Sequence, residues 1–421
     1  MKKIKLIEKI EGEATLKFSY KDNLIDFVDI EFFNTRNIEN ILQNKPALDA
    51  LVVNPRVCGI CGHAHLQATA KALEDCIDGL VLSNKAKIIR ELSLNFEIIQ
   101  NHFKWFYMTI MPLLGYKDTY IKALYPSQTI NKAIATIAGQ YPHNSYAIVG
   151  GIVSEVTTMD LVRLKSLIDE VVEFFEKEVV QNSIENIQEC DNVDLLLSRE
   201  GDLSKILHHL KNQNLDNIGK SYDRFIVFGS SSYFKSGKSN KTRVTKSLDT
   251  KYIQEIPNQT SKAKNVTYKD KYFEVGPLSR AMLKKTPLIK DAHRKYGDSI
   301  FSRIIARVCE IPQLLLHSKD LISQIDLTEP SYIEPRVDIS QLSGAGVGIV
   351  EAARGSLIHK VNLQNGIIKD YQIITPTQWN LGNGTKESLA IAQKAMVGLD
   401  DEHTAELVFK TFDVCSVCTT H

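Results

Sequence analysis

The sequence predicts an α+β protein that is predominantly α, with long core helices around a buried metal site and peripheral β-rich segments. Apolar residues recur every three or four positions over three long stretches, which is typical of helices with one buried face. Two C-x-x-C pairs stand near opposite ends of the chain, and such pairs favour metal binding. Short apolar runs bounded by turn residues predict the strands.

The first two long helices follow directly from this periodicity. We expect one helix from Asn84 to Leu114, because its apolar residues share one face and Pro112 and Gly115 mark its end. A second helix is expected from roughly Thr157 to Ile187, with charged residues opposite its apolar face. Both helices should contribute to the core.

The third long helix contains a proline. It is expected over about 299–325, and Pro312 should kink or divide it, because proline lacks the backbone N–H that a helix interior needs. Shorter helices are expected at 38–42, 384–398 and 402–411.

Two regions read as strands. Residues 14–33 predict a β-hairpin, broken at Lys21-Asp22-Asn23. Residues from about 225 to 275 are polar and rich in Gly-Ser turns, and we expect them to form a β-rich excursion on the surface. Because no repeat and no linker separates two halves, we expect a single domain over 1–421.

Charge and hydropathy exclude several function classes. The 421 residues include 51 basic and 50 acidic side chains, so no net charge draws the chain to nucleic acid or to an anionic membrane. No window offers about 18 uninterrupted apolar residues, so we expect no transmembrane segment. The N-terminus has no apolar core of signal-peptide length. We therefore expect a cytoplasmic protein, at most peripheral at the membrane through partner subunits.

The cysteines provide the main functional signal. Cys58 and Cys61 form one C-x-x-C pair, and Cys415 and Cys418 form the other. In a reducing compartment such pairs favour metal binding over disulfides. Cys61 and Cys415 are 354 positions apart, so a shared metal requires the whole chain to close around it. The remaining cysteines are expected to be packing residues on helical stretches: Cys76, Cys190 and Cys309.

The residues alone leave the identity of the metal open. A C-x-x-C step lets two thiolates bind one ion from a turn or a helix start, where free backbone N–H groups stabilise negative sulfur. Four thiolates form a soft site that admits zinc, iron-sulfur or nickel-iron. Structural zinc sites have their second pair within about 15–20 residues in most cases, which weighs against zinc here. An iron-sulfur cluster held by two distant pairs is a further alternative.

The segments around the cysteines resemble signatures of nickel-iron hydrogenase large subunits. Residues 56–65 are similar to R-x-C-G-x-C-x-x-x-H, and residues 413–421 to D-P-C-x-x-C-x-x-H. Other segments along the whole chain also resemble that family: Lys9-Ile10-Glu11-Gly12, Arg36-Asn37-Ile38-Glu39, Pro142-His143-Asn144, Gly150-Gly151, 274–280, 351–355 and 375–380. The resemblance implies the fold of that family and a nickel-iron centre with carbon monoxide and cyanide ligands.

The resemblance also assigns roles around the metals. Cys58 and Cys415 would be terminal nickel ligands, while Cys61 and Cys418 would bridge nickel and iron. The implied reaction is the reversible heterolytic cleavage of H2 into protons and electrons. Cys415 would accept the proton and Glu11 would carry it onward, because a shielded carboxylate can have its pKa raised toward the working range.

Three further residues would bind the diatomic ligands. Arg354 would lie over the open coordination position and donate hydrogen bonds from its guanidinium group. Thr377, with the backbone after Pro376, would bind the other cyanide. Apart from the resemblance, an arginine before glycine is usually a solvated loop residue, and a threonine in a proline turn is usually structural.

A magnesium site is also implied by the resemblance. Its ligands map to Glu39, His421 and the main-chain carbonyl of Ile373. Magnesium requires near-octahedral oxygen and nitrogen surroundings and usually retains water, which would extend the proton route.

Three positions depart from the family pattern. Val414 and Ala353 stand where many members have proline, which loosens the local backbone without removing a ligand. Asn101 falls where many relatives place an aspartate that supports the active-site arginine. We therefore expect Arg354 to have a weaker orienting partner.

The predicted function is that of a catalytic large subunit with several partners. Too few cysteines remain for an electron relay, so an iron-sulfur small subunit is expected as electron partner, with H2 as substrate and maturation proteins that assemble the centre. The sequence stops at His421, and we expect that no C-terminal extension is encoded. Two alternatives are an H2-sensing regulatory subunit with slow turnover and a non-catalytic zinc or iron-sulfur scaffold.

Overall fold

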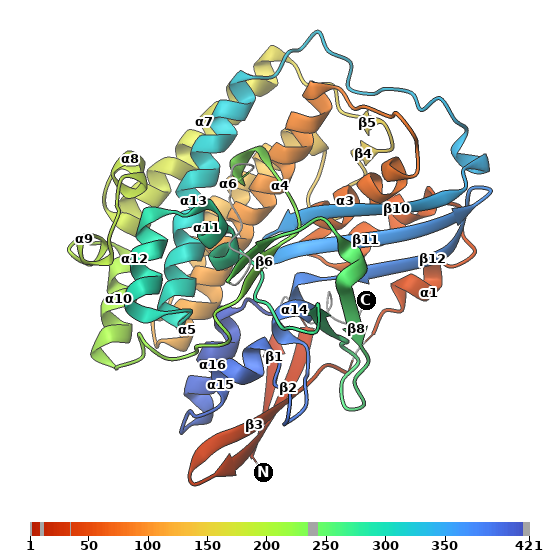
Figure 1. Ribbon diagram of the computed structural model, residues 1–421. Coiled ribbons are helices and arrows are strands. Elements are labelled where there is room, and N and C mark those ends of the chain that lie inside the picture. The colour runs from red at the N-terminus through yellow and green to blue at the C-terminus, as the bar shows by residue number, and fades with distance from the viewer. Residues whose placement is uncertain (1, 9–11, 34, 235–242, 416–421) are drawn as a thin grey trace.

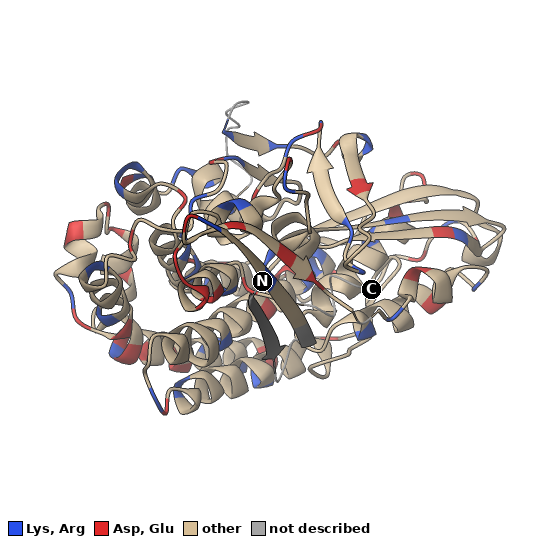
Figure 2. Ribbon diagram, turned by 90° about the horizontal axis from the view of Figure 1, so that it is seen from below, with Lys and Arg blue, Asp and Glu red and all other residues tan. Residues whose placement is uncertain are grey.

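The bundle of long helices and the two three-stranded sheets lie on different sides of the molecule. The computed structural model describes residues 2–8, 12–33, 35–234 and 243–415. In Figure 1 a bundle of long helices lies on the left, one sheet extends to the right, and a second sheet lies below. Figure 2 shows basic and acidic residues interspersed over helices and strands in the view from below. The prediction of a mainly helical α+β fold is confirmed.

Four long helices form the bundle, and α4 packs against both α6 and α13, while α6 packs against α7. Their bounds are Asn84–Lys104 for α4, Tyr120–Ala138 for α6, Thr158–Phe174 for α7 and Ile300–Ser323 for α13. Helices of 8 to 14 residues surround them: α3 (Gly62–Asp75), α10 (Asp202–Asn212), α11 (Pro277–Lys284), α12 (Pro287–Tyr296) and α16 (Glu402–Thr411). The shortest helices are α1 (Ile38–Leu42), α2 (Asp49–Val53), α5 (Met111–Leu113), α8 (Ile184–Gln188), α9 (Val193–Leu197), α14 (Pro376–Leu381) and α15 (Ile391–Met396).

No helix in the described part of the chain combines the length and apolar character needed to cross a membrane.

The first predicted long helix is confirmed. Ser83 caps α4 by accepting a hydrogen bond from the amide of Ala86, and the apolar stripe of the helix is buried. After Lys104 the helix widens into a π-helical turn, Trp105–Ile110, before its last residues in α5. Such turns re-aim the side chains that follow them.

The second predicted helix is too long at its C-terminal end. A capping box at Thr157 and Asp160 starts α7, and helical structure ends at Val180. Gln181 is left-handed, with φ of 44°, and α8 then begins separately after Ser183. The apolar spacing continues across this break, which is why periodicity alone missed it.

Of the two outcomes expected at Pro312, division of the helix is wrong, because α13 runs through the proline without interruption. The helix continues from Ile300 to Ser323, and residues on both sides of the proline are buried in the core. Burial of the flanking turns stabilises the helix despite the missing N–H.

The N-terminal sheet contains the predicted hairpin. Strands β2 (Gly12–Lys21) and β3 (Leu24–Glu31) pair antiparallel, and Asp22 and Asn23 take positive φ in the turn between them. A strand not predicted, β1 (Lys2–Glu8), pairs with β2.

The sheet β10–β11–β12 was not among the predicted elements. Its strands are Gly344–Ala352, Gly355–Gln364 and Ile367–Ile374, and β10 and β11 pack against α3. A Cβ atom on Gly348 would lie 1.8 Å from the carbonyl oxygen of Ala68, so only glycine permits this approach. This sheet therefore packs directly on α3, the helix that begins beside the first cysteine pair.

The region 225–275 contains four short strands, but much of it is buried. The strands are β6 (Phe225–Val227), β7 (Val244–Lys246), β8 (Ile253–Ile256) and β9 (Asn265–Tyr268). Ile226, Phe228 and Val266 form a second small core with Ile358 and Trp379. The expected surface excursion is therefore packed onto the sheet β10–β12 through its apolar residues.

Of the last two predicted helices, one is confirmed and the other is shorter than expected. The helix at 402–411 is confirmed as α16, whereas only Ile391–Met396 of the predicted 384–398 is helical. The side chain of Gln393 accepts hydrogen bonds from the amides of Gly384 and Ala390 and so holds the preceding residues as a loop. That hydrogen-bonded loop replaces the helix start.

Candidate metal centre

Cys58 and Cys61 lie at the start of α3. A 3-10 turn, Asn54–Val57, ends at Cys58, and Cys61 is the N-cap residue of α3. Both cysteines are buried, at 0% and 6% exposure. The amide of Ile60 lies 3.4 Å from the Cys58 sulfur and donates a hydrogen bond to it. The predicted placement of the pair at a helix start is confirmed.

Cys415 reaches this pair from the other end of the chain. It follows α16, is fully buried, and its sulfur lies 3.5 Å from that of Cys58. The sulfur atoms of Cys58, Cys61 and Cys415 all lie within 4.8 Å of one another. This separation exceeds a disulfide bond and suits three ligands of a shared metal site. Cys418 lies outside the described residues.

Arg354 lies at the turn between β10 and β11, where Ala352 pairs with Gly355. The backbone is tight there, because a Cβ on Gly276 would lie 2.8 Å from the Arg354 carbonyl oxygen. The arginine is 4% exposed, which contradicts the reading of a solvated loop residue.

Asp413 orients Arg354, and the expectation of a weak orienting partner is wrong. The Arg354 Nε donates to the carbonyl oxygen of Asp413 at 3.0 Å, and Nη2 donates to its Oδ1 at 3.0 Å. Arg307 donates to the other carboxylate oxygen at 2.7 Å. Asn101 instead donates to the carbonyl oxygen of Ile60, so the arginine depends on Asp413.

A chain of buried charges continues from Arg307. Arg307 lies 3.3 Å from Nδ1 of His102, whose Nε2 lies 2.8 Å from Glu310. Glu310 also accepts two bonds of 2.7 Å from Arg280, which in turn pairs with Glu351 at 3.2 Å. Since Nδ1 accepts from a guanidinium group, His102 is neutral and donates from Nε2; burial lowers its pKa to about 4. These contacts hold Arg280 and Arg307 in place.

Glu97 is a buried residue of the site that the sequence analysis missed. Its carboxyl oxygens accept hydrogen bonds from the amides of His63 and Ala64 at 2.8 and 3.1 Å. Burial raises the pKa of Glu97 to about 8, against the lowering effect of these bonds and of Arg354. Two free N–H groups of the α3 N-terminus therefore bind a carboxyl group rather than sulfur. A buried glutamate in the apolar pattern of α4 was the available signal.

Pro376 and Thr377 begin α14. Thr375 caps this helix through a capping box with Gln378, and Pro376 is the first helical residue. Thr377 is 2% exposed, and within the described chain its Oγ1 has no hydrogen-bond partner. A buried hydroxyl of this kind is costly unless a ligand or water satisfies it.

The two predicted magnesium ligands within the described residues lie together. The Glu39 Oε1 accepts a 2.7 Å hydrogen bond from the amide of Ile373. Lys264 Nζ lies 3.4 Å from Glu39 and 3.4 Å from Glu255. The contact on Ile373 is made by its N–H, whereas the predicted ligand is its carbonyl. His421 and the proton carrier Glu11 lie outside the described residues.

The remaining cysteines behave as packing residues. Cys190 and Cys309 are buried and Cys76 is partly buried. Burial raises the pKa of the Cys309 thiol to about 12 and that of Cys76 to about 11, which keeps both protonated and unreactive. Cys190 lies in the loop after α8 rather than on a helix, so that part of the prediction is wrong.

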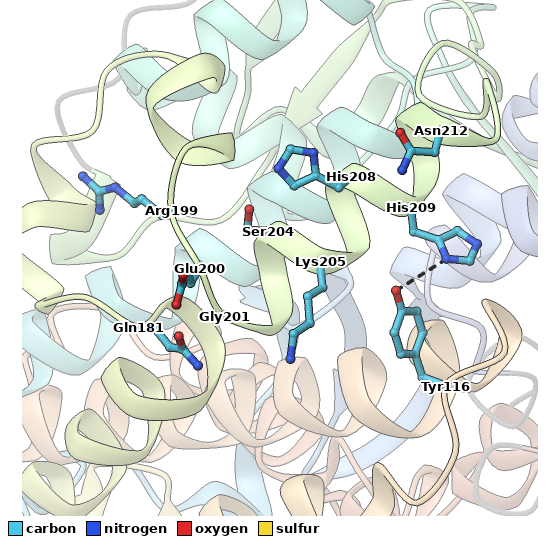
Figure 3. A pocket seen from close by; sticks show the side chains of 10 residues that line it. All are labelled: Tyr116, Gln181, Arg199, Glu200, Gly201, Ser204, Lys205, His208, His209 and Asn212. Atoms are coloured by element: carbon cyan, nitrogen blue, oxygen red, sulfur yellow. Dashed lines mark hydrogen bonds between the residues drawn. The ribbon is translucent and has the colours of Figure 1, made fainter.

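Two cavities differ in their relation to the cysteines. A cavity of about 520 Å³, drawn in Figure 3, lies between α10 and the turn at Gln181, and none of the predicted site residues is among those that line it. A second cavity, of about 800 Å³, is lined by Ile60, Asn101 and Lys410 among others. This second cavity adjoins the segment that carries the first cysteine pair.

Comparisons with known proteins agree with this geometry. A family model described as nickel-dependent hydrogenase matches residues 36–111 and 210–421. The chain is 24% identical to the sulfhydrogenase 1 subunit alpha of Pyrococcus furiosus over 438 residues, which covers 99% of this chain and 96% of the relative. It is also 24% identical to the coenzyme F420 hydrogenase subunit alpha of Methanocaldococcus jannaschii over 428 residues, with 99% and 90% covered.

The fold also matches solved structures. The reduced, active nickel-iron-selenium hydrogenase of Desulfomicrobium baculatum superposes with a TM-score of 0.83 at 20% identity, and the match covers 100% of this chain and 99% of that chain. A second such enzyme, from Desulfovibrio vulgaris Hildenborough, gives 0.82. The architecture is therefore that of these chains.

Proposed function

Because this chain is a large subunit of the nickel-dependent hydrogenase family, we propose that it catalyses the reversible heterolytic cleavage of H2. Protons leave through the protein, and electrons pass to an iron-sulfur small subunit. The observation that carries the proposal is the meeting of three buried cysteine sulfurs within 4.8 Å from opposite ends of the chain.

The residues present fit a nickel-iron centre with diatomic ligands. Three soft sulfur donors face one another, and Cys418 would supply the fourth. The Thr377 Oγ1, which has no partner among the described residues, offers a hydrogen bond to a cyanide ligand. Arg354 offers further donors and positive charge from a rigid ion pair with Asp413.

The bound centre would polarise H2 so that a nearby base can take a proton from it. Cys415 Sγ is the proposed base, because Cys415 follows closely after Asp413, which forms an ion pair with Arg354. The guanidinium group of Arg354 stabilises negative charge at the reacting position, and Asp413 keeps the arginine in place. Glu11 is proposed to carry the proton from Cys415 toward solvent.

The magnesium site is a further part of the proposal. Glu39 and the Ile373 carbonyl would bind the ion together with His421, and the charge of Lys264 would have to be accommodated beside it. The proximity of Glu39 to the Ile373 backbone supports this assignment.

Electron transfer requires a partner. Among the described residues, Cys58, Cys61 and Cys415 form the one group of three or more His, Cys, Asp or Glu side chains whose ligand atoms lie close enough to share a metal. The described part of the chain therefore offers no second such group to hold an electron-accepting cluster. We propose an iron-sulfur small subunit as the electron acceptor, maturation proteins as the source of the assembled centre, and the cytoplasm as the location.

Infrared spectroscopy of the purified complex tests the function. Bands of metal-bound carbon monoxide and cyanide, with nickel and iron near one each per chain, are expected. Cys415→Ser should abolish the bands and H2–D2 exchange, while Cys190→Ser, the matched control, should keep both. Zinc without nickel would establish the scaffold alternative instead. Normal bands with slow turnover and H2-dependent binding to a signalling partner would establish the sensor.

A further inference from the structure

Glu97 binds the first turn of the helix that carries Cys61. Its two carboxyl oxygens accept from the amides of His63 and Ala64, the second and third residues of α3. Glu97 is fully buried, and Cys61 is the N-cap residue of the same helix without a side-chain cap of its own. Glu97 therefore performs the capping that Cys61 cannot perform while its sulfur faces the metal site.

Asn101 binds the residue just before Cys61. Its amide nitrogen donates to the carbonyl oxygen of Ile60 at 2.7 Å and to the carbonyl oxygen of Glu97 at 2.7 Å. The hydroxyl of Tyr141 donates to the same Ile60 oxygen at 3.0 Å. Asn101 follows Glu97 by four positions, so both side chains leave one face of α4.

The two side chains match the polarity of what they bind. Glu97 presents acceptors to two N–H groups, and Asn101 presents a donor to two carbonyl oxygens. We infer that Glu97 and Asn101 are positioning residues that clamp the Ile60–Ala64 segment, and that this chain requires an amide at position 101. Where Cys61 is a metal ligand, the clamp fixes the direction of its sulfur.

An aspartate at position 101 would reverse the match. An ionised carboxylate has no proton to donate, and even a protonated one has a single proton for the two carbonyl oxygens that Asn101 now binds. Arg354 lowers the pKa of Glu97 through its charge, but the carboxylate that binds its guanidinium group is that of Asp413. Asn101 binds backbone carbonyl oxygens, and an aspartate at this position would lose those bonds.

The test uses the full chain with its partner subunit and three kinds of measurement: hydrogen exchange of peptides over 59–66, nickel content, and the infrared bands. The variants are Glu97→Gln, Glu97→Ala, Asn101→Asp, Asn101→Ala and the double variant Glu97→Gln/Asn101→Asp. Asn95→Asp is the matched control, because Asn95 is an equally buried asparagine of α4 whose amide contacts Ser318 at 3.4 Å.

Glu97→Ala and Asn101→Asp should each speed exchange over 59–66 by about tenfold, because buried hydrogen bonds to that segment are lost. Both should also lower nickel content severalfold and broaden the carbon monoxide band of the metal that remains. Glu97→Gln keeps one acceptor oxygen for the two amides that Glu97 binds, so it should speed exchange over 59–66, but less than Glu97→Ala does. Asn95→Asp should leave exchange over 59–66 and nickel content unchanged.

The double variant separates hydrogen-bond polarity from charge. It keeps the number of buried carboxyl groups but moves one from position 97 to position 101. If net charge alone matters, it should resemble the parent; the clamp predicts exchange at least as fast as in Asn101→Asp, because bonds are lost at both positions.

Parent-like exchange, nickel content and bands in Asn101→Asp would overturn the inference. If that variant cannot be obtained folded, Asn101→Ala removes the same two bonds without adding a carboxylate, and unchanged exchange there would overturn it equally. The inference about Cys61 rests on the proposed function, but the exchange measurement does not. Absence of nickel and of bands in the parent would refute the function, and local exchange would still decide the clamp.

Discussion

Around Cys58 and Cys61, side chains of α4 hold the chain by hydrogen bonds to backbone amides and carbonyls. Around Cys415, the neighbouring Asp413 holds it through ion pairs with Arg307 and Arg354. The two segments meet at one site, yet the first is fixed by groups with little net charge and the second by fully buried charges. Breaking a buried ion pair leaves an unpaired charge and costs much more than removing one neutral hydrogen bond. The second segment should therefore be the more fragile.

Asp413→Asn tests this contrast with the largest expected effect. It leaves both Arg307 and Arg354 without their buried carboxylate, and should lower the free energy of unfolding by about 3–5 kcal/mol. Urea unfolding measures the loss, and nickel content should fall with it. Asp194→Asn, which breaks an exposed pair with Lys295, should cost less than about 1 kcal/mol. Equal costs for the two variants would contradict the contrast.

The pH dependence of the free energy of unfolding tests the buried charged residues around Arg307. His102 is neutral in the folded protein, with its pKa lowered from 6.5 to about 4, so the unfolded chain binds a proton first as pH falls. Stability should fall between pH 6.5 and 4 by up to about 3 kcal/mol, and this group adds no further loss below that range. Urea unfolding at several pH values measures the slope.

His102→Gln is the matched variant for this slope. It removes the titrating group, so the part of the slope between pH 6.5 and 4 that belongs to His102 should disappear. An unchanged slope in the variant would assign the pH dependence to other residues.

Gly348→Ala tests the support behind the first cysteine segment. The added methyl group would meet the backbone of α3 at the Ala68 carbonyl oxygen, so α3 must move away from β10. We expect a loss of about 1–3 kcal/mol in the free energy of unfolding and faster hydrogen exchange in α3. Gly59→Ala, where an added Cβ meets nothing within 4 Å, is the control and should keep its stability. An unchanged free energy of unfolding in Gly348→Ala would show that β10 can shift away from α3 without cost.

Thr377→Val should have the smallest effect on stability. The hydroxyl has no partner in the described chain, so its removal should change the free energy of unfolding by less than about 0.5 kcal/mol. The cyanide bands should nevertheless shift if this hydroxyl donates to a ligand. Thr375→Val removes a helix cap and should cost about 1 kcal/mol without such a shift. Unshifted bands in Thr377→Val would remove this residue from the proposed site.

Sequence periodicity predicted the elements whose burial follows a regular spacing. The long helix α4 and the hairpin β2–β3 are of this kind. The meeting of Cys58 with Cys415 was predicted on other grounds, from the two C-x-x-C pairs and the resemblance of their motifs. The strand β10 escaped because Gly344, Gly346 and Gly348 interrupt its apolar alternation. The positions of these glycines are set by the close contact between β10 and α3. That contact joins segments far apart in the sequence, so no local pattern shows it.

The partners of buried polar groups were also beyond local patterns. Asp413 was read as part of a motif, but its role as the anchor of Arg354 depends on how α16 ends beside the β10–β11 turn. Glu97 lies in the predicted helix α4, but its role depends on the start of α3 packing across it. Tertiary structure decides such pairings, because each buried polar group forms hydrogen bonds with whichever groups the fold brings next to it.

The sulfur atoms of Cys58 and Cys415 touch across 357 positions of sequence. During synthesis on a ribosome, the first cysteine pair therefore emerges long before its counterpart, and must wait in a partly formed chain. A metal delivered early would meet only two of the described sulfurs, whereas the docking of α16 completes the enclosure. The three sulfur atoms can therefore come together only after a contact forms between segments almost a whole chain length apart. Contacts that close such long loops form slowly, because closing the loop costs conformational entropy.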